Sequence, residues 1–147
     1  MVNNRQSQVG DDKISSFTLK ADLSELKILA EKIENFGQQN EIPEKNIFEV
    51  NLVLDELFTN LVSYGCFSDS HSFDIELILK DGVMFIEIRD DGKPFNPLDI
   101  PEPEIQCDCD ERRIGGLGIH FMRKMMDSIE YELGNGKNIL KLTKIIQ

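Results

Sequence analysis

Two segments of alternating apolar and polar residues flank a tight turn in the middle of this chain. Residues 73–79 and 83–88 both alternate, and Asp81-Gly82 between them is a strong short-range signal for a two-residue hairpin. Alternation places every second side chain on the same face, as in a strand that is half-buried against a core. The centre of the chain is therefore predicted to be an antiparallel β-hairpin with one covered face.

Two amphipathic helices are expected on the N-terminal side of this hairpin. The first follows Asp22, a suitable N-cap, and Gly37 is expected to end it. The second has Pro43 in its first turn and runs to about Tyr64, with Gly65 as its stop signal. Apolar residues recur at helical spacing in both segments, so each helix is expected to bury one face.

The complete order of predicted elements indicates the fold class. A strand at 14–19 precedes the two helices, an irregular stretch lies C-terminal to the hairpin, a third helix opens at 115–118, and strands at 129–133 and 139–146 close the chain. This order predicts a two-layer α+β sandwich, an α/β protein in the broad sense. Its mixed, mostly antiparallel sheet is expected to carry the helices on one face.

Length and charge narrow the class of protein further. The 147 residues suffice for one domain with its own core, assigned to 14–147, and the polar residues 1–13 are expected to be a flexible leader. Neither a secretory signal nor an apolar run of membrane-spanning length is evident, so a cytoplasmic protein without a membrane partner is expected. A formal net charge of −11 disfavours direct binding of nucleic acid.

The three cysteines do not indicate a disulfide framework or a metal centre. Their odd number, with no export signal, favours free thiols. Cys107 and Cys109 form a C-x-C pair, but no second Cys or His cluster lies near them in the sequence, whereas a zinc site needs three or four such ligands. We therefore expect two small loop residues there, and an unremarkable thiol at Cys66.

A polar stripe accompanies the apolar face of the second predicted helix. Glu56, Asn60 and Tyr64 recur every four residues and so share one face. The amide oxygen of Asn60 is a hard ligand suited to Mg²⁺, and Glu56, one turn earlier, is placed to act as a general base. Asp55 is rotated by about 100° and is expected to face elsewhere. The alternative interpretation is a solvated polar face without a site.

Two glycine-containing segments complete a candidate nucleotide pocket. Asp90 ends a strand, where its carboxylate can accept a hydrogen bond from the exocyclic amine of adenine, and Gly92 allows close approach of the backbone. The glycines of Gly115–Gly118 would turn backbone N–H groups toward phosphates at a helix start. The alternative for Asp90–Gly92 is an ordinary Asp-Gly turn, and the alternative for Gly115–Gly118 is a glycine-rich turn that only begins a helix. A P-loop is excluded, because the Lys-Ser/Thr ending is missing.

The irregular stretch between these segments is unusually long for a compact domain. It is rich in proline and acidic residues, and loops of this length are often functional lids. Arg112 and Arg113 lie at its end, where one of them could fold over phosphates. The alternatives are a solvated acidic insertion and a surface arginine pair that balances it. His120, one turn into the third predicted helix, is expected to be a helix-packing or surface residue, and the alternative is a phospho-accepting histidine. His71, near a strand start, is unremarkable.

With these segments in order, the chain resembles the histidine-kinase-like ATPase (GHKL) superfamily, and within it the anti-sigma factor serine/threonine kinases and anti-sigma regulatory proteins. The segment L-V-L-D-E-L-F-T-N-L-V-S-Y-G resembles the N-box of the family. R-D-D-G-K-P-F-N-P-L resembles its first glycine box, and R-R-I-G-G-L-G-I-H-F-M-R-K-M-M-D its second. The resemblance extends from Ile14 to Ile146.

The resemblance implies roles for individual residues. It implies the Bergerat ATP-binding fold, with ATP and Mg²⁺ as cofactors, Asn60 as metal ligand, Glu56 as catalytic base and an ATP lid at 93–114. The residues that it implies around the nucleotide are Asn60, Asp90, Gly92, Pro94, Phe95, Arg113, Gly115, Gly116, Leu117 and Gly118. The implied reaction is transfer of the γ-phosphate to a serine or threonine of a STAS-type anti-anti-sigma protein.

Further partners and alternatives follow from the same resemblance. It implies that the protein also holds a sigma factor inactive, and a homodimer is expected. A binding module that uses ATP only to order its lid, and an ATPase in which Glu56 activates water, are the alternative functions. The chain departs from the family pattern at Tyr64, where a His is frequent, at Pro94, which replaces a second Gly, and at Lys137-Asn138, where many relatives have Thr.

Overall fold

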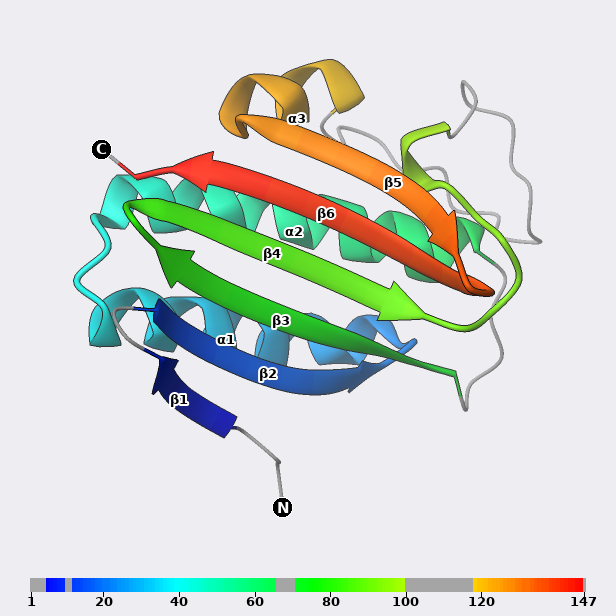
Figure 1. The fold of residues 1–147 in the computed structure, drawn as a ribbon. Coiled ribbons are helices and arrows are strands. Elements are labelled where there is room, and N and C mark those ends of the chain that lie inside the picture. The colour runs from blue at the N-terminus through cyan, green and yellow to red at the C-terminus, as the bar shows by residue number, and fades with distance from the viewer. Residues whose placement is uncertain (1–4, 10–11, 66–70, 100–117, 147) are drawn as a thin grey trace.

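The computed structural model describes residues 5–9, 12–65, 71–99 and 118–146. Within them the chain forms two layers, with a strongly twisted antiparallel sheet in front and the helices behind one of its faces (Figure 1). The α+β two-layer architecture predicted from the sequence is confirmed.

The sheet has six strands in the order β1-β2-β3-β4-β6-β5. Every neighbouring pair is antiparallel, so the expectation of a mixed sheet is wrong for the described strands. No parallel pair arises because the third helix is followed by β5 at the edge of the sheet, and β5 pairs with β6 as a second antiparallel hairpin. The strands are β1 (Arg5–Val9), β2 (Asp12–Lys20), β3 (Ser72–Lys80), β4 (Val83–Asp90), β5 (Ser128–Gly134) and β6 (Lys137–Ile145).

The central hairpin forms as predicted. Lys80 of β3 pairs with Val83 of β4, and Asp81 and Gly82 between them have φ values of 50° and 76°. Positive φ at both loop residues matches the right-handed twist of the flanking strands.

Three α-helices and two short 3₁₀ turns connect the strands. They are η1 (Leu23–Glu25), α1 (Leu26–Gln39), α2 (Glu44–Tyr64), η2 (Pro97–Asp99) and α3 (Ile119–Met125). Asp22 caps η1 rather than α1, because its carboxylate accepts a hydrogen bond from the Ser24 amide at 3.0 Å, which lowers the pKa of Asp22. Among the described helices, none has the length and apolarity required to cross a bilayer.

Gly37 does not end the first helix, contrary to the sequence prediction. It lies inside α1, which continues to Gln39, and it is buried against α2. A Cβ atom at this position would lie 2.5 Å from Cγ1 of Ile47. The glycine therefore serves close packing of α1 on α2 and not helix termination.

The N-terminal segment also differs from the prediction. Residues 1–13 were expected to be a flexible leader, whereas Arg5–Val9 forms strand β1 and β2 begins at Asp12. The reason is the open edge of β2, whose unpaired backbone groups accept β1 in register, with Val9 opposite Asp12.

The core fills the space between α1, α2 and the covered face of the sheet. Leu29 and Ile33 of α1 and Leu54 and Phe58 of α2 are at most 2% exposed. On the strands, buried residues alternate with exposed or half-buried ones, as the two-residue period of a sheet requires. Because of the same alternation, some polar residues of the strands also face the helices.

Candidate functional site

One end of the sheet brings polar side chains onto its helix-covered face. Buried residues alternate along β4, and this period places Asp90 on the same face as Ile88. The β4–β6 register sets Asn138 opposite Asp90. On the other side of β4, His71 immediately precedes β3 and has the same parity as buried Phe73. His71, Asp90 and Asn138 thus meet although they lie far apart in the sequence.

Asp90 is the centre of this cluster, and its side chain is only 3% exposed. His71 Nε2 lies 2.9 Å from Asp90 Oδ2, and because a carboxylate oxygen accepts, the imidazole donates. The Gly92 amide and Asn138 Nδ2 donate to the same oxygen at 3.3 and 3.4 Å. Oδ2 therefore accepts all three hydrogen bonds that the described residues donate to the Asp90 carboxylate.

Asn138 ties the chain that leaves β4 to strand β6. Its Nδ2 donates to the carbonyl oxygens of Lys93 at 3.0 Å and Gly92 at 3.4 Å. Its Oδ1 accepts from the Phe95 amide at 3.1 Å and from the hydroxyl of Tyr131 on β5. One buried amide side chain thereby holds the first residues of the predicted lid against the sheet.

Tyr131 completes the polar cluster. Burial raises the pKa of its phenol above the ordinary value of 10.0, and the charge of Asp90 acts in the same direction, while the Phe95 amide opposes them. The neutral phenol is therefore favoured, which keeps its hydroxyl available as the donor to Asn138.

A small pocket adjoins the cluster and connects it to α2. Leu61, which directly follows Asn60 in the helix, forms part of its wall. Its walls are mostly apolar around one buried carboxylate, and its volume is about 10 Å³, so a flat ring that carries an amine would fit only after the lining residues move apart. The lining residues are Leu61, Phe73, Ile88, Asp90, Phe95, Pro97, Tyr131, Asn138 and Leu140.

The predicted stripe on α2 lies at the boundary of the core. Asn60 is 9% exposed, Glu56 is half-buried, and Asp55 is exposed, as the rotation between the two acidic residues requires. A buried amide oxygen on a rigid helix is a suitable ligand for a hard cation. No cluster of three or more His, Cys, Asp or Glu capable of holding a metal occurs among the described residues. A metal here would therefore depend on Asn60 together with oxygens of its own ligand.

The glycine segments are only partly described. Gly118 caps α3 with φ −75°, and a Cβ atom there would meet nothing closer than the His120 amide at 4.0 Å. Neither backbone conformation nor packing within the described residues requires a glycine at this position. Pro94 is exposed and Phe95 packs against the core. Arg113, Gly115, Gly116, Leu117, Arg112, the three cysteines and the lid from residue 100 onward lie outside the described residues.

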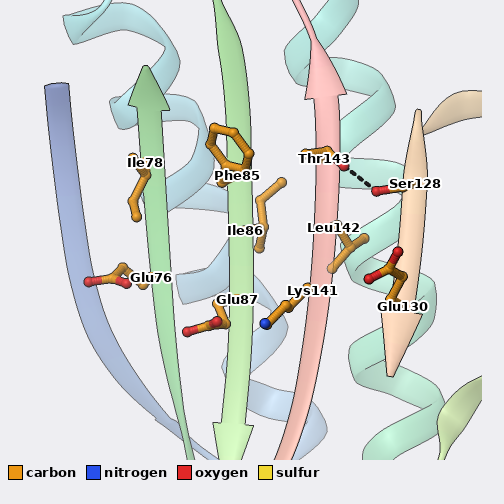
Figure 2. A pocket seen from close by; sticks show the side chains of 10 residues that line it. All are labelled: Glu76, Ile78, Phe85, Ile86, Glu87, Ser128, Glu130, Lys141, Leu142 and Thr143. Carbon is orange, nitrogen blue, oxygen red and sulfur yellow. Dashed lines mark hydrogen bonds between the residues drawn. The ribbon is translucent and has the colours of Figure 1, made fainter. Parts of the chain in front are cut away.

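Two larger hollows lie away from this cluster. One, of about 390 Å³, is on the open face of the sheet, where Figure 2 shows the strands with the helices behind them; most of its lining residues face outward, while Ile86 and Leu142 belong to the core. Its hydroxyls, Ser128 and Thr143, are hydrogen-bonded to each other. The other, also about 390 Å³, lies between α1 and α2. None of the described residues predicted for the site lines either hollow.

The sequence predictions missed part of the cluster. The sequence assigned no role to His71, Asn138 entered only as a departure from the family pattern, and Tyr131 was not considered for the site. The sequence did contain a signal for His71. It lies two residues before Phe73 and so faces the same side of the sheet, and the Asp81-Gly82 turn sets the β3–β4 register that brings this end of β3 beside the end of β4. The β4–β6 pairing that brings in Asn138 and Tyr131 is not local, and no short-range signal predicts it.

A family model and individual relatives place the chain in the same protein family. The family model described as histidine kinase-like ATPase domain matches residues 19–144. The chain is 31% identical over 98 residues to the serine/threonine-protein kinase BtrW of Bordetella bronchiseptica, covering 65% of this chain and 68% of that protein. It is 29% identical over 83 residues to an anti-sigma F factor of Oceanobacillus iheyensis, covering 56% and 57% respectively.

A solved structure supports the fold. The crystal structure of the RsbU and RsbW domains of a Mycobacterium tuberculosis protein is similar with a TM-score of 0.65 and 14% sequence identity. The similarity covers 90% of this chain and 32% of that chain. At this identity the likeness concerns the fold alone.

Proposed function

This chain belongs to the family of histidine kinase-like ATPase domains, and on that premise we propose that it is an ATP-binding regulator of the anti-sigma type with serine/threonine kinase activity. Its substrate in this proposal is a serine or threonine of a STAS-type anti-anti-sigma protein, and its second partner is a sigma factor. The relatives named a serine/threonine-protein kinase and an anti-sigma F factor support this assignment.

The observation that carries the proposal is the disposition of the Asp90 carboxylate. Oδ2 accepts every hydrogen bond that the described residues give to the Asp90 carboxylate, so Oδ1 keeps its acceptor capacity, and Asp90 lines a small, mostly apolar pocket. Adenine offers an amine to such an oxygen, whereas guanine presents a carbonyl that would be left facing the carboxylate unpaired. This arrangement supports recognition of an adenine nucleotide.

In this proposal, Asn60 on α2 and Gly118, which precedes α3, serve the remaining parts of the nucleotide. The amide oxygen of Asn60 suits Mg²⁺, and the bare backbone at Gly118 leaves room for a group outside the described protein atoms. The acidic chain repels anionic ligands at long range, so local attraction of this kind is required.

In this proposal the residues of the chain position the nucleotide and accept one proton from the attacking hydroxyl. When bound, Mg-ATP supplies the phosphoryl group, and the metal neutralises charge on the phosphate oxygens. Glu56, half-buried one helical turn before Asn60, would accept the proton of the attacking hydroxyl. Asp90 binds the base at the other end of the site and takes no part in the transfer.

A titration of nucleotides tests the binding part of the proposal. Thermal unfolding is followed with ATP, ADP or GTP, with and without Mg²⁺, for wild type, Asp90→Asn and Asn60→Ala. We expect adenine-selective stabilisation of wild type, about 2.7 kcal/mol at 100 times Kd. Asp90→Asn should lose the selectivity, and Asn60→Ala should lose the Mg²⁺ dependence while it remains folded without nucleotide.

Two results would contradict these assignments. Unchanged Mg²⁺-dependent affinity in Asn60→Ala would reject the metal-ligand role. No response of wild type to any nucleotide at millimolar concentration would reject nucleotide binding by the isolated chain.

A further inference from the structure

We infer that His71 is a positioning residue for nucleotide recognition. From the start of β3 it fixes the Asp90 carboxylate, so that one oxygen is committed to the protein and the other is left for the amine of the base. The inference rests on the proposed function, and it assigns a specificity-determining role to a residue outside the three sequence motifs.

His71 makes the shortest of the hydrogen bonds to Asp90. Its Nε2 lies 2.9 Å from Oδ2, within the usual range, whereas the donors Gly92 and Asn138 lie at 3.3 and 3.4 Å, beyond the preferred distance. Asn138 also divides its amide between Asp90 and two backbone carbonyls. His71 is thus the donor that most strongly determines how the carboxylate is turned.

His71 is itself held in place by the core. Its ring packs edge-to-face on Phe73 at 5.2 Å and 84°, and Phe73 packs in the same way on Phe58 of α2 at 5.7 Å and 72°. Its backbone carbonyl accepts from the Ala21 amide at 2.9 Å. Because Phe58 lies between Glu56 and Asn60 in the helix, this row of rings connects the base-recognising end of the site to α2.

Loss of the imidazole donor should free the carboxylate. The terminal torsion of an aspartate has a broad, two-fold profile, so a hydrogen bond of good geometry is needed to select one orientation. With only two long hydrogen bonds left, the carboxylate would no longer be held in one orientation. The loss should therefore be felt by the base's amine and not by the sugar or phosphates.

Isothermal titration with ADP and inosine diphosphate tests this role. The two ligands share sugar and phosphates, and inosine carries a carbonyl where adenine carries the amine. His71→Phe keeps a ring on Phe73 and removes the donor, whereas His71→Gln keeps an N–H donor and removes the ring. We expect His71→Phe to bind ADP about tenfold more weakly with inosine diphosphate unchanged, and His71→Gln to keep most of the selectivity.

Each other outcome has a distinct meaning. An equal loss for both ligands in His71→Phe would show a structural role and overturn the inference, as would unchanged ADP affinity. Should His71→Phe fail to fold, loss of selectivity in a folded His71→Gln would still overturn it. If wild type binds neither ligand, the proposed function fails and the inference with it, whereas normal wild-type selectivity with no effect of His71 rejects the inference alone.

Discussion

Asn138 lies directly opposite Asp90 in the β4–β6 ladder, and the amide that donates to Asp90 also donates to the carbonyl of Lys93. One side chain therefore connects the buried carboxylate to the segment that leaves β4. Asp90, the residue proposed to recognise the base, and the start of the predicted lid are connected, because the same amide side chain holds both.

Replacing Asn138 by Ala should weaken both stability and nucleotide binding. The substitution removes the Asn138 acceptor from the Phe95 amide and the Tyr131 hydroxyl, and because both groups are only half-buried, the cost should lie toward the lower end of about 1–3 kcal/mol. Urea unfolding measures the loss of stability, and ADP titration measures the loss of affinity. Tyr131→Phe is the graded control, because it removes one donor and should cost about 1 kcal/mol. Equal effects of the two substitutions would contradict the central role of Asn138.

Tyr131 should titrate above pH 10. Burial and the charge of Asp90 raise the pKa of its phenol above the unfolded value of 10.0. A raised pKa stabilises the fold fully below pH 10.0, and this contribution is lost as pH rises through the folded pKa. Absorbance of phenolate measures the titration in Tyr64→Phe, where Tyr131 is the remaining tyrosine. Adding Asp90→Asn should lower the pKa, and a titration at or below pH 10.0 would contradict the burial of the hydroxyl.

The fold was largely predictable because most of its signals are local. The Asp81-Gly82 turn and the alternation around it predict the hairpin that the structure contains. Errors arose where tertiary contacts override local signals. Gly37 is a common helix terminator, but here it permits contact with Ile47, and β1 forms because β2 offers an open edge.

The sequence motifs named Asp90 and Asn60 as site candidates, but they did not name the side chains that surround Asp90. Asp90 and Asn60 were expected at the site from residue type and spacing, and the structure buries both. His71 and Asn138 join Asp90 only through strand pairing, and the β4–β6 pairing spans 48 residues between Asp90 and Asn138. Cross-strand partners at this separation follow from topology, which no short motif specifies.

Gly37→Ala should destabilise the protein although alanine favours helices. A Cβ atom would lie 2.5 Å from Cγ1 and 2.7 Å from Cδ1 of Ile47, so either the Ile47 side chain or the two helices would have to move. The overpacking should exceed the gain of about 1 kcal/mol in helix propensity and leave a net loss of about 1–2 kcal/mol. Chemical denaturation measures this loss.

A double substitution separates overpacking from other causes. Ile47→Ala removes both atoms that the new Cβ would approach, so Gly37→Ala should cost less in that background than in wild type. Gln38→Ala, at an exposed position of the same helix, should stay within about 0.5 kcal/mol. Additive effects at positions 37 and 47 would show that the two helices do not meet as closely as the structure indicates.

Glu56→Gln should abolish phosphoryl transfer without loss of nucleotide binding. The substitution keeps shape and hydrogen-bonding capacity but removes the group proposed to take the proton of the attacking hydroxyl, which should slow transfer at least about 100-fold. The measurement is transfer from γ-labelled ATP to a purified STAS-domain anti-anti-sigma protein, with ADP affinity determined in parallel. Asp55→Asn is the matched control, because Asp55 is the adjacent acid on an exposed face of α2.

The two substitutions separate the possible bases and the possible functions. Normal transfer by Glu56→Gln, with loss in Asp55→Asn, would assign the base to Asp55 and require α2 to present its other face. A binding module gated by ATP would give a different result. Wild type would then bind ADP without transferring phosphate, and Glu56→Gln would bind a sigma factor with the same affinity as wild type. Release of free phosphate by wild type, lost in Glu56→Gln, would instead make water the acceptor. Because Glu56 is half-buried beside the buried Asn60 while Asp55 is exposed, we expect the loss to follow Glu56.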